Sequence, residues 1–376
     1  MDIKELLGFL ECEKVEFKEL GELCKINGGK LNANKAQPKG LYEFFTYDYN
    51  NPKFVDNYAW DTEALIICKK DNGENPCRYF NGKFNAFQWM RILHSFKNEA
   101  NIHYIKYYFN AIFMQFLQTN SINISLPYIA IETIKKFQIP LPPLEIQQKI
   151  VEILDSFTEL QAELQAELHA RRKQYEYYRN KLLSFEELEK RANAIGGLKL
   201  VRLGEVCEVK RGVRVTKKDL TENEKYPVFQ NSLTPMGYYN QSNVNANTPF
   251  IIVGGSAGEI GWSSSSYWAA DDCIYFICEK SLMNRFLYHA LCNQQHYFLS
   301  QVRKASIPRL SQDCIKKVKI PLPPLEVQND IVEILDKFDA LANDLSAGLP
   351  AEIDARQKQY EHYREQLLSF REKCEL

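Results

Sequence analysis

The chain has 376 residues, of which 45% are hydrophobic, and it carries 47 basic and 48 acidic side chains. This length gives room for two or three domains, and the composition is ordinary for a folded protein. The formal net charge of −1 excludes a strongly basic protein, so any surface that binds nucleic acid has to be local. No apolar run approaches the roughly 18 residues of a membrane span, and the charged beginning has no signal-peptide core. We therefore expect a cytoplasmic protein without membrane contact.

Residues 1–138 predict a first domain of mixed α and β structure. The sequence Leu-Gly-Glu-Leu-Cys stands near its beginning, at residues 20–24. An apolar run at residues 64–68 is typical of a buried strand, and residues 102–117 have the apolar periodicity of a helix.

Residues 139–197 predict a long helix that follows a proline-rich start. Pro142 and Pro143 prevent an earlier helical start, and Glu145 suits the positive end of the helix dipole. The apolar residues then recur with the spacing of a coiled-coil seam. A helix of about 40 residues would be about 60 Å long at a rise of about 1.5 Å per residue. We expect its seam to include Ile150, Phe157, Leu160, Leu164, Leu168 and Tyr175.

Residues 198–319 predict a second α/β domain, which begins with Leu-Gly-Glu-Val-Cys at residues 203–207. Apolar runs between Gly, Ser and Asn turns indicate strands, and a longer periodic segment indicates a helix. The expected strands are residues 249–253, 267–270 and 273–277, and the expected helix is near residues 284–299.

Residues 320–376 repeat the proline-rich start and the long helix of residues 139–197. The sequence Ile-Pro-Leu-Pro-Pro-Leu-Glu at residues 139–145 recurs 181 residues later, as does Ile-Val-Glu-Ile-Leu-Asp at residues 150–155. This spacing indicates an internal duplication. The second helix has four extra residues around Gly348 and Pro350, where the proline is expected to kink or restart it. We expect its seam to include Ile331, Phe338, Leu341, Leu345 and Tyr360.

The predicted fold class is α+β, with two α/β domains separated by two long helices that pack as an intramolecular antiparallel coiled coil. Either helix alone would leave an apolar stripe in water, so we expect the two to pair. Antiparallel pairing gives the repeat a pseudo-two-fold axis, whereas parallel pairing would need one variable domain to travel the full helix length. The expected domains are residues 1–138 and 198–319, and the expected conserved helical regions are residues 139–197 and 320–376.

The motifs do not support catalysis by this chain. Residues 254–258 fit the Gly-x-Ser-x-Gly pattern of a hydrolase, but a turn and β structure follow where a hydrolase needs a helix. Residues 51–54 have lysine where the target-base motif of a DNA methyltransferase needs its second proline. Residues 28–31 lack the earlier glycine and the Ser or Thr of a phosphate-binding Walker A loop. We therefore expect no catalytic residues.

The cysteines and histidines do not predict a metal site. None of the ten cysteines forms a Cys-x-x-Cys pair, and Cys273 and Cys278 lie in an apolar run that is typical of a buried strand. The six histidines are scattered. We expect neither structural zinc nor a disulfide framework.

The repeated Pro-Leu-Pro-Pro-Leu-Glu-x-Gln, the helices with Gln-Tyr-Glu-x-Tyr-Arg and the two Leu-Gly-Glu-x-Cys openings occur in a fixed order. In this combination the chain resembles, over nearly its whole length, the specificity subunit of a type I restriction-modification enzyme. The helix segment of residues 159–168, Glu-Leu-Gln-Ala-Glu-Leu-Gln-Ala-Glu-Leu, is similar to the tetrapeptide spacer repeat of that family, and residues 253–261 resemble its target-recognition domains. The first domain departs more from the pattern, because it lacks a Gly-Ser-x-Gly turn after Cys68.

The resemblance implies a non-catalytic specificity subunit of a restriction system, with two target-recognition domains that each read one half of a split target in double-stranded DNA. The conserved helices would set the gap between the halves and dock two methyltransferase subunits, and restriction/translocase subunits would complete the enzyme. No cofactor is expected in this chain, because S-adenosylmethionine and ATP would bind to the partner subunits.

Within this resemblance, the basic residues of the two domains are the candidates for DNA contact. Arg and Lys bind phosphates, Arg also reads base edges, and the glycine turn around Ser256 offers backbone amides to a phosphate. The candidates are Lys69, Lys70, Arg78, Lys83 and Arg91 in the first domain, and Lys210, Arg211, Arg214, Lys217, Lys218, Ser256, Arg303, Lys304 and Arg309 in the second.

Two alternatives remain open from the sequence. Arg171, Arg172, Lys173 and Arg179 on the first helix suit either the DNA backbone between the half-sites or an acidic partner surface. The rival to a DNA reader is a structural scaffold, in which the helix pair joins two protein-binding modules. Binding to DNA that weakens steeply with salt separates the two, because it is expected of the reader and not of the scaffold.

Overall fold

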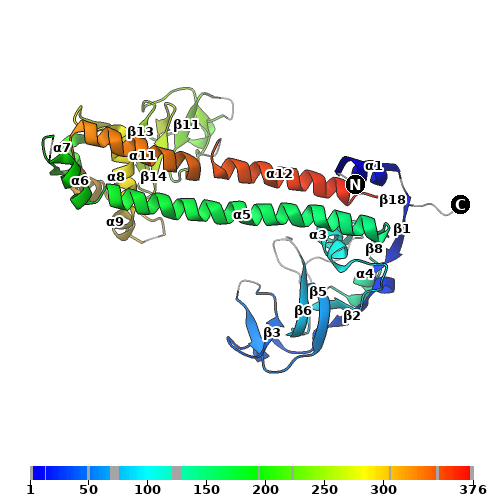
Figure 1. The fold of residues 1–376 in the computed structure, drawn as a ribbon. Coiled ribbons are helices and arrows are strands. Elements are labelled where there is room, and N and C mark those ends of the chain that lie inside the picture. The colour runs from blue at the N-terminus through cyan, green and yellow to red at the C-terminus, as the bar shows by residue number, and fades with distance from the viewer. Residues whose placement is uncertain are drawn as a thin grey trace. The chain divides into compact units, whose positions relative to one another are not determined.

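The computed structural model describes residues 3–12, 14–48, 51–67, 76–120, 129–193, 195–221, 224–304, 306–343 and 347–372. The chain folds into two compact units (Figure 1). Unit 1 comprises Met1–Glu163 and Ile353–Leu376, and unit 2 comprises Leu164–Glu352. The predicted candidates Lys69, Lys70 and Leu345, and the expected strand end at Cys68, lie outside the described residues.

Unit 1 is built on a six-stranded sheet with the order β2-β7-β5-β6-β3-β4. A second, three-stranded sheet has the order β18-β1-β8, and helix α3 packs against β5 and β6. The helices outside the long pair are α1 (Ile3–Cys12), α2 (Leu20–Leu23), the 3-10 helix η1 (Ala33–Lys35), α3 (Ile102–Thr119) and α4 (Ile131–Lys135). The strands are β1 (Lys14–Glu19), β2 (Lys25–Gly28), β3 (Tyr42–Phe45), β4 (Lys53–Val55), β5 (Trp60–Ile67), β6 (Cys77–Ala86), β7 (Arg91–His94), β8 (Gln138–Leu141) and β18 (Arg371–Glu372).

Aromatic side chains of α3 form the core of unit 1. Phe109 stacks on Phe113 with ring centroids 4.0 Å apart, and Phe137 meets both rings edge-on. All three side chains are buried. Asn101 caps the helix, because its side chain accepts hydrogen bonds from the backbone amides of His103 and Tyr104. The predicted helix at residues 102–117 is therefore confirmed.

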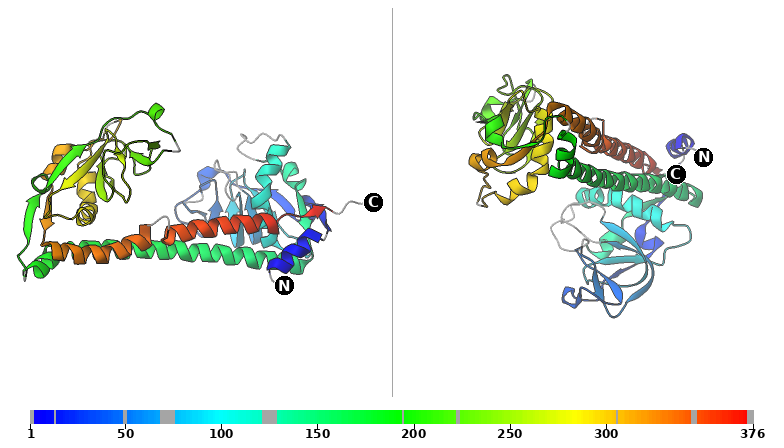
Figure 2. Two further views of the ribbon diagram at one scale, coloured as in Figure 1. Left: turned by 90° about the horizontal axis from the view of Figure 1, so that it is seen from above. Right: turned by 60° about the vertical axis from the view of Figure 1, so that its left-hand side comes forward.

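Unit 2 contains a four-stranded sheet with the order β10-β16-β13-β14, a three-stranded sheet with the order β12-β11-β15 and the pair β17-β9. Helix α8 packs across β13 and β14 (Figure 2). The strands are β9 (Lys199–Arg202), β10 (Cys207–Arg211), β11 (Tyr226–Phe229), β12 (Tyr238–Tyr239), β13 (Thr248–Ile252), β14 (Ile260–Ser263), β15 (Trp268–Ala269), β16 (Cys273–Cys278) and β17 (Lys319–Leu322). The shorter helices are α6 (Phe185–Ala192), α7 (Leu203–Val206), the 3-10 helix η2 (Lys217–Asp219), α8 (Asn284–Asn293), α9 (Gln295–Ser300) and α10 (Gln312–Lys317). The helix expected near residues 284–299 is thus two helices.

The opening and closing motifs of each copy lie together. In unit 1 β1 pairs antiparallel with β8, and the Leu20 amide donates to the Phe137 carbonyl at 2.9 Å. In unit 2 β9 pairs antiparallel with β17, and the Leu203 amide donates to the Val318 carbonyl, also at 2.9 Å. The two copies therefore close each α/β domain with the same backbone contacts.

The first long helix, α5 (Leu144–Leu182), runs for 39 residues and begins directly after the two prolines. The predicted second helix is two helices, α11 (Leu325–Asn343) and α12 (Leu349–Leu367). The start of α12 at Leu349 agrees with the expected restart at Pro350. Among the described residues, no helix is both long and apolar enough to cross a membrane.

The long helices run antiparallel within each unit. In unit 1 the ring of Phe157 on α5 stacks on Tyr363 of α12 at 5.7 Å, and the Gln161 amide donates to Gln357 at 2.7 Å. In unit 2 Tyr178 of α5 stacks on Phe338 of α11 at 5.0 Å. Each aromatic contact therefore includes one predicted seam residue, Phe157 in unit 1 and Phe338 in unit 2.

The structure corrects one predicted seam position and adds another. Leu341 is 39% exposed, and its neighbour Ala342 is fully buried in its place. Leu154, which the predicted spacing omitted, is also fully buried, because residues of the first α/β domain pack on α5 and widen its apolar stripe beyond a two-helix seam. Phe185, which follows α5, is 52% exposed at the start of α6.

Candidate functional site

A buried carboxylate organises the basic surface of unit 2. The side chains of Arg211, at the end of β10, and Arg309 both contact Oδ1 of Asp272, the former at 3.4 Å. The Asp272 side chain is 12% exposed, whereas those of Arg211 and Arg309 are 54% and 47% exposed. The buried Asp272 carboxylate therefore binds both guanidinium groups from the protein interior. Part of each guanidinium group stays exposed to a ligand.

The Gly-Gly-Ser turn makes this arrangement possible. Gly254 forms an antiparallel bridge with Arg309, and a Cβ at residue 254 would lie 2.6 Å from the carboxylate carbon of Asp272. Gly255 has a φ of +81°, which favours glycine. After Ser256 the chain leads into β14 and not into a helix, so the turn is not a nucleophile elbow. The glycines of this turn allow the backbone to lie close to Asp272 and Arg309.

Two further predicted residues lie beside this cluster. Arg303 and Arg309 exchange backbone hydrogen bonds of 2.9 and 3.2 Å, and Lys304 is exposed next to them. On β10, Lys210 forms an ion pair with Glu208 at 3.2 Å. The remaining candidates follow β10 and are exposed: they are Arg214, in the loop, and Lys217 and Lys218, in η2.

In unit 1 the predicted residues Arg78 and Lys83 lie on β6 and are exposed. Lys83 forms a long ion pair of 3.9 Å with Asp61 and lies 4.9 Å from the ring centre of Tyr58. Arg78 lines a pocket of about 440 Å³ together with Lys106 and Arg364. Sequence reasoning missed the last two. Arg364 is marked by the repeated Gln-Tyr-Glu-x-Tyr-Arg motif, but nothing in the sequence marks Lys106.

Arg91 has to be removed from the candidates for DNA contact. It is only 8% exposed. Its Nε donates to the Ile129 carbonyl at 2.8 Å, and its Nη1 donates to the carbonyls of Met90 at 3.1 Å and Gln88 at 3.3 Å. The guanidinium group therefore supports the backbone from the inside of the domain.

The repeated Tyr-x-x-x-Arg of the long helices forms the same contact in both units. The guanidinium carbon of Arg179 lies 5.2 Å from the ring centre of Tyr175, and that of Arg364 lies 5.5 Å from Tyr360. Arg179 lines a pocket of about 300 Å³ beside α8 and α9, and Arg172 lines it too. Arg179 therefore packs on its own helix, whereas Arg172 is exposed, and neither observation separates a DNA backbone from an acidic partner surface as the ligand.

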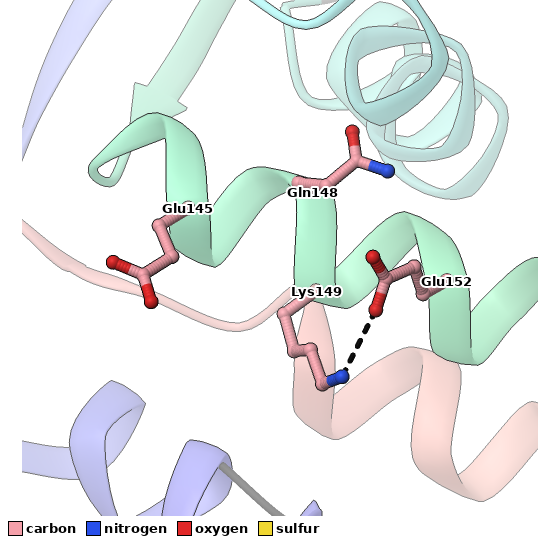
Figure 3. Close-up of a pocket in the computed structure, with 4 residues that line it drawn as sticks. All are labelled: Glu145, Gln148, Lys149 and Glu152. Atoms are coloured by element: carbon pink, nitrogen blue, oxygen red, sulfur yellow. Dashed lines mark hydrogen bonds and ion pairs between the residues drawn. The ribbon is translucent and has the colours of Figure 1, made fainter.

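The first turns of α5 carry exposed charges that recur in the second copy. Glu145, Gln148, Lys149 and Glu152 line a hollow of about 270 Å³, and Lys149 and Glu152 form an ion pair at 2.9 Å. Figure 3 shows that Gln148 points toward α3. Glu145 and Glu152 correspond to Glu326 and Glu333, which are also exposed. Each copy therefore presents the same pair of carboxylates.

The described residues contain no group of His, Cys, Asp and Glu that is arranged to hold a metal ion. Cys207 and Cys278 are partners across strands β10 and β16, with their sulfur atoms 3.2 Å apart and both thiols free. Sequence spacing missed this pair, because the two residues lie far apart in the chain. Burial and the adjacent thiol raise the pKa of Cys207, with the hydrogen bond to Cys278 as the larger cause.

Comparisons with known proteins agree on one family. A family model described as the type I restriction modification DNA specificity domain matches the chain twice, at residues 12–171 and 196–355. A putative type I restriction enzyme specificity subunit of Haemophilus influenzae is 30% identical and is aligned over 96% of this chain and 97% of its own. A specificity subunit of an Escherichia coli type I restriction enzyme is 32% identical over 98% of both chains.

Solved structures show the same fold at lower sequence identity. The S subunit of a type I restriction-modification system from M. genitalium has a TM-score of 0.68 and 19% identity, covering 96% of this chain and 97% of that one. A chain from a structure of the type I system that concerns complex assembly and conformational transition has a TM-score of 0.56 and 18% identity. The similarity extends over both recognition regions and the long helices.

Proposed function

Because this chain belongs to the family of type I restriction-modification DNA specificity subunits, we propose that it reads a DNA target in two separate parts, one with each target-recognition domain. Specificity subunits recognise DNA targets and are non-catalytic, so this chain is a recognition subunit and not an enzyme. The proposal that the DNA target has two parts goes further than family membership.

One observation carries the proposal: the chain repeats its frame but not its basic surface. The opening and closing backbone contacts are the same in both units. The exposed cations differ, since unit 2 presents Arg211 and Arg309 on Asp272 whereas unit 1 presents Arg78 and Lys83 on β6. Two different polar surfaces in equal frames suit two different half-sequences, because base readout depends on a few side chains.

The long helices would act as the ruler between the two half-sites. We propose that α5 pairs with α11 and α12 as one antiparallel coiled coil, which the aromatic contacts in each unit support. The repeated carboxylates Glu145, Glu152, Glu326 and Glu333 suit two equivalent docking sites for methyltransferase subunits. S-adenosylmethionine, ATP and the cleavage reaction would belong to those and further partner subunits.

The test is DNA binding by the assembled methyltransferase as a function of salt. With a target found by methylation mapping, the affinity should fall linearly on logarithmic axes as salt rises, because cationic side chains release counterions from the phosphates. Moving either half-sequence by one base pair should weaken binding. The scaffold alternative predicts no preference for a target sequence, and equal binding to shuffled DNA would support it against our proposal.

A further inference from the structure

Two glutamines are fully buried in the helical frame, one in each copy. Gln147 and Gln328 stand at the end of the repeated Pro-Leu-Pro-Pro-Leu-Glu-x-Gln and are 0% exposed. A buried primary amide is costly unless its donors and its acceptor are all satisfied. The hydrogen-bond partners of these two side chains therefore indicate their structural role.

In unit 1 Gln147 joins the frame to the recognition domain. Its Oε1 accepts a hydrogen bond of 2.8 Å from the backbone amide of Asn101, the N-cap of α3. Its Nε2 donates to the carbonyl of Glu99 at 2.9 Å and to that of Pro142 at 2.8 Å. One side chain thus clamps the start of the domain's helix against the proline loop of the frame.

Unit 2 contains the same clamp. The Oε1 of Gln328 accepts from the backbone amide of Met283, the N-cap of α8, at 2.9 Å. Its Nε2 donates to the carbonyls of Ser281 and Pro323, both at 2.8 Å. The chain therefore builds an identical three-bond joint twice, against two recognition domains of different sequence.

Each clamp forms its hydrogen bonds to the recognition domain with main-chain atoms. A backbone amide and a backbone carbonyl are available whatever the side chains are, so the joint does not depend on the sequence of the domain. The neighbouring contact between frame and domain is made by side chains and differs between the two copies. Asp155 accepts from the Tyr107 hydroxyl at 2.6 Å, whereas its counterpart Asp336 binds Arg285 and His289, each at 2.7 Å.

We propose that Gln147 and Gln328 are positioning residues that fix the orientation of each target-recognition domain on the helical frame through a joint that any such domain can use. The proposal rests on the proposed function, because it assigns the glutamines a part in keeping two half-site readers in register. Neither residue touches DNA in this role.

The test replaces Gln328 with methionine, which has a similar length but no amide, in the full chain assembled with its methyltransferase. The exposed Gln366 on α12 provides the matched control Gln366→Met. We expect Gln328→Met to lower the methylation rate at the natural target roughly ten- to hundredfold, because a small misplacement of a bound group has an effect of this size. The preference for the natural gap over a gap changed by one base pair should fall toward unity, while the bases read in each half stay the same.

Amide hydrogen exchange on the chain alone tests the joint without DNA. In the wild-type chain the Met283 and Asn101 amides should both exchange slowly. In Gln328→Met the Met283 amide should exchange at least tenfold faster, with Asn101 as the internal control. Fast exchange at Met283 in the wild type, or a Gln328→Met variant with unchanged rate and gap preference, would overturn the proposal. A wild-type enzyme without any gap preference would instead contradict the bipartite function, and the exchange result would still decide the clamp.

Discussion

Asp272 shows how one residue prepares a basic surface for recognition. Its carboxylate is shared by Arg211 and Arg309, so both guanidinium groups are held before any ligand arrives. A held side chain loses less conformational entropy on binding than a free one. Lys304, in contrast, is exposed and flexible by its chemistry. Arg309 is therefore the better candidate for base readout, and Lys304 for phosphate contact.

This difference predicts two kinds of mutant. Arg309→Ala should weaken specific binding by about 1–3 kcal/mol and relax the preference at one position of the second half-site. Lys304→Ala should weaken binding equally for all sequences and reduce the slope of affinity against salt by about 1. Binding to a set of single-base target variants at several salt concentrations measures both effects. A sequence-independent loss in Arg309→Ala would show that Arg309 contacts phosphate instead.

His289 makes the stability of unit 2 depend on pH. The ring is fully buried, with Nδ1 3.0 Å from the Tyr175 hydroxyl and Nε2 2.7 Å from Asp336. Burial lowers the pKa of His289, and the hydrogen bond to Asp336 offsets this only in part. A histidine in the unfolded chain has a pKa of about 6.5. As the pH falls through that value, the unfolded state gains a proton that the folded state resists.

We therefore expect unit 2 to lose stability between about pH 6.5 and the lower pKa of the folded state. Asp336 contributes little to the change in stability over that pH range. Burial acts to raise its pKa, but hydrogen bonds from His289 and Arg285 hold it below the usual value, so its contribution is lost only in stronger acid. Hydrogen exchange of α8 amides between pH 5 and 7.5, corrected for the intrinsic rate, measures the effect. The variant His289→Gln should flatten the dependence, and an equally steep one would exclude His289 as its source.

At the scale of elements, apolar periodicity predicted α5 well because its stripe is long and starts at a clear signal, Pro142 and Pro143. It also predicted the restart near Pro350. It failed at Leu341, because an alanine one position later fits the interior and no spacing rule distinguishes the two. The basic clusters were recognised as local runs. Their partner Asp272 was not, because it reaches Arg211 and Arg309 only through the pairing of strands and loops distant in sequence.

The tetrads that end at Leu160, Leu164 and Leu168 predict a helix whose length sets the gap between the half-sites. Adding one Gln-Ala-Glu-Leu unit lengthens α5 by about 6 Å and turns it by about 400°, so the apolar stripe keeps its direction. DNA advances about 3.4 Å per base pair. The variant should fold and recognise the same half-sequences across a gap that is longer by at most about two base pairs.

A two-residue insertion at the same place is the matched control. It rotates the stripe by about 200°, away from its partner, and should destabilise the helix pair. Methylation-site mapping and thermal unfolding of both variants provide the measurements. Full activity across an unchanged gap in the four-residue variant would mean that residues 158–168 do not set the spacing.

The whole molecule combines a repeated frame with two recognition domains that have diverged. Each frame contacts its domain through a main-chain clamp by Gln147 or Gln328 and through side-chain contacts that include Asp155 or Asp336. The glutamine clamp is the same in both copies, whereas the aspartate contact differs. Divergence of the domains is therefore compatible with a constant frame, because the clamp can stay while the side-chain contacts are rebuilt when a domain changes.

This arrangement predicts the outcome of a domain exchange. Replacing residues 198–319 with the corresponding region of a relative removes Arg285 and His289, and with them their hydrogen bonds to Asp336 and the second bond of Arg285 to Asp339. It keeps Gln328 and Pro323, and any grafted backbone supplies the remaining partners of the clamp. The hybrid should be less stable in unit 2 where the relative has no donor for Asp336. It should still assemble, and it should read a new second half-sequence beside the original first one.

Methylation-site mapping of the hybrid and of both parents decides the matter. A second exchange that also carries Asp336 and Asp339 to the relative's residues should restore stability without changing either half-sequence, since those residues act on the joint and not on bases. If the exchange alters both half-sequences, the domains do not read independently, and the duplication would then serve the frame alone. If the second half-sequence stays unchanged, base readout lies outside residues 198–319. The cluster around Asp272 then does not read bases.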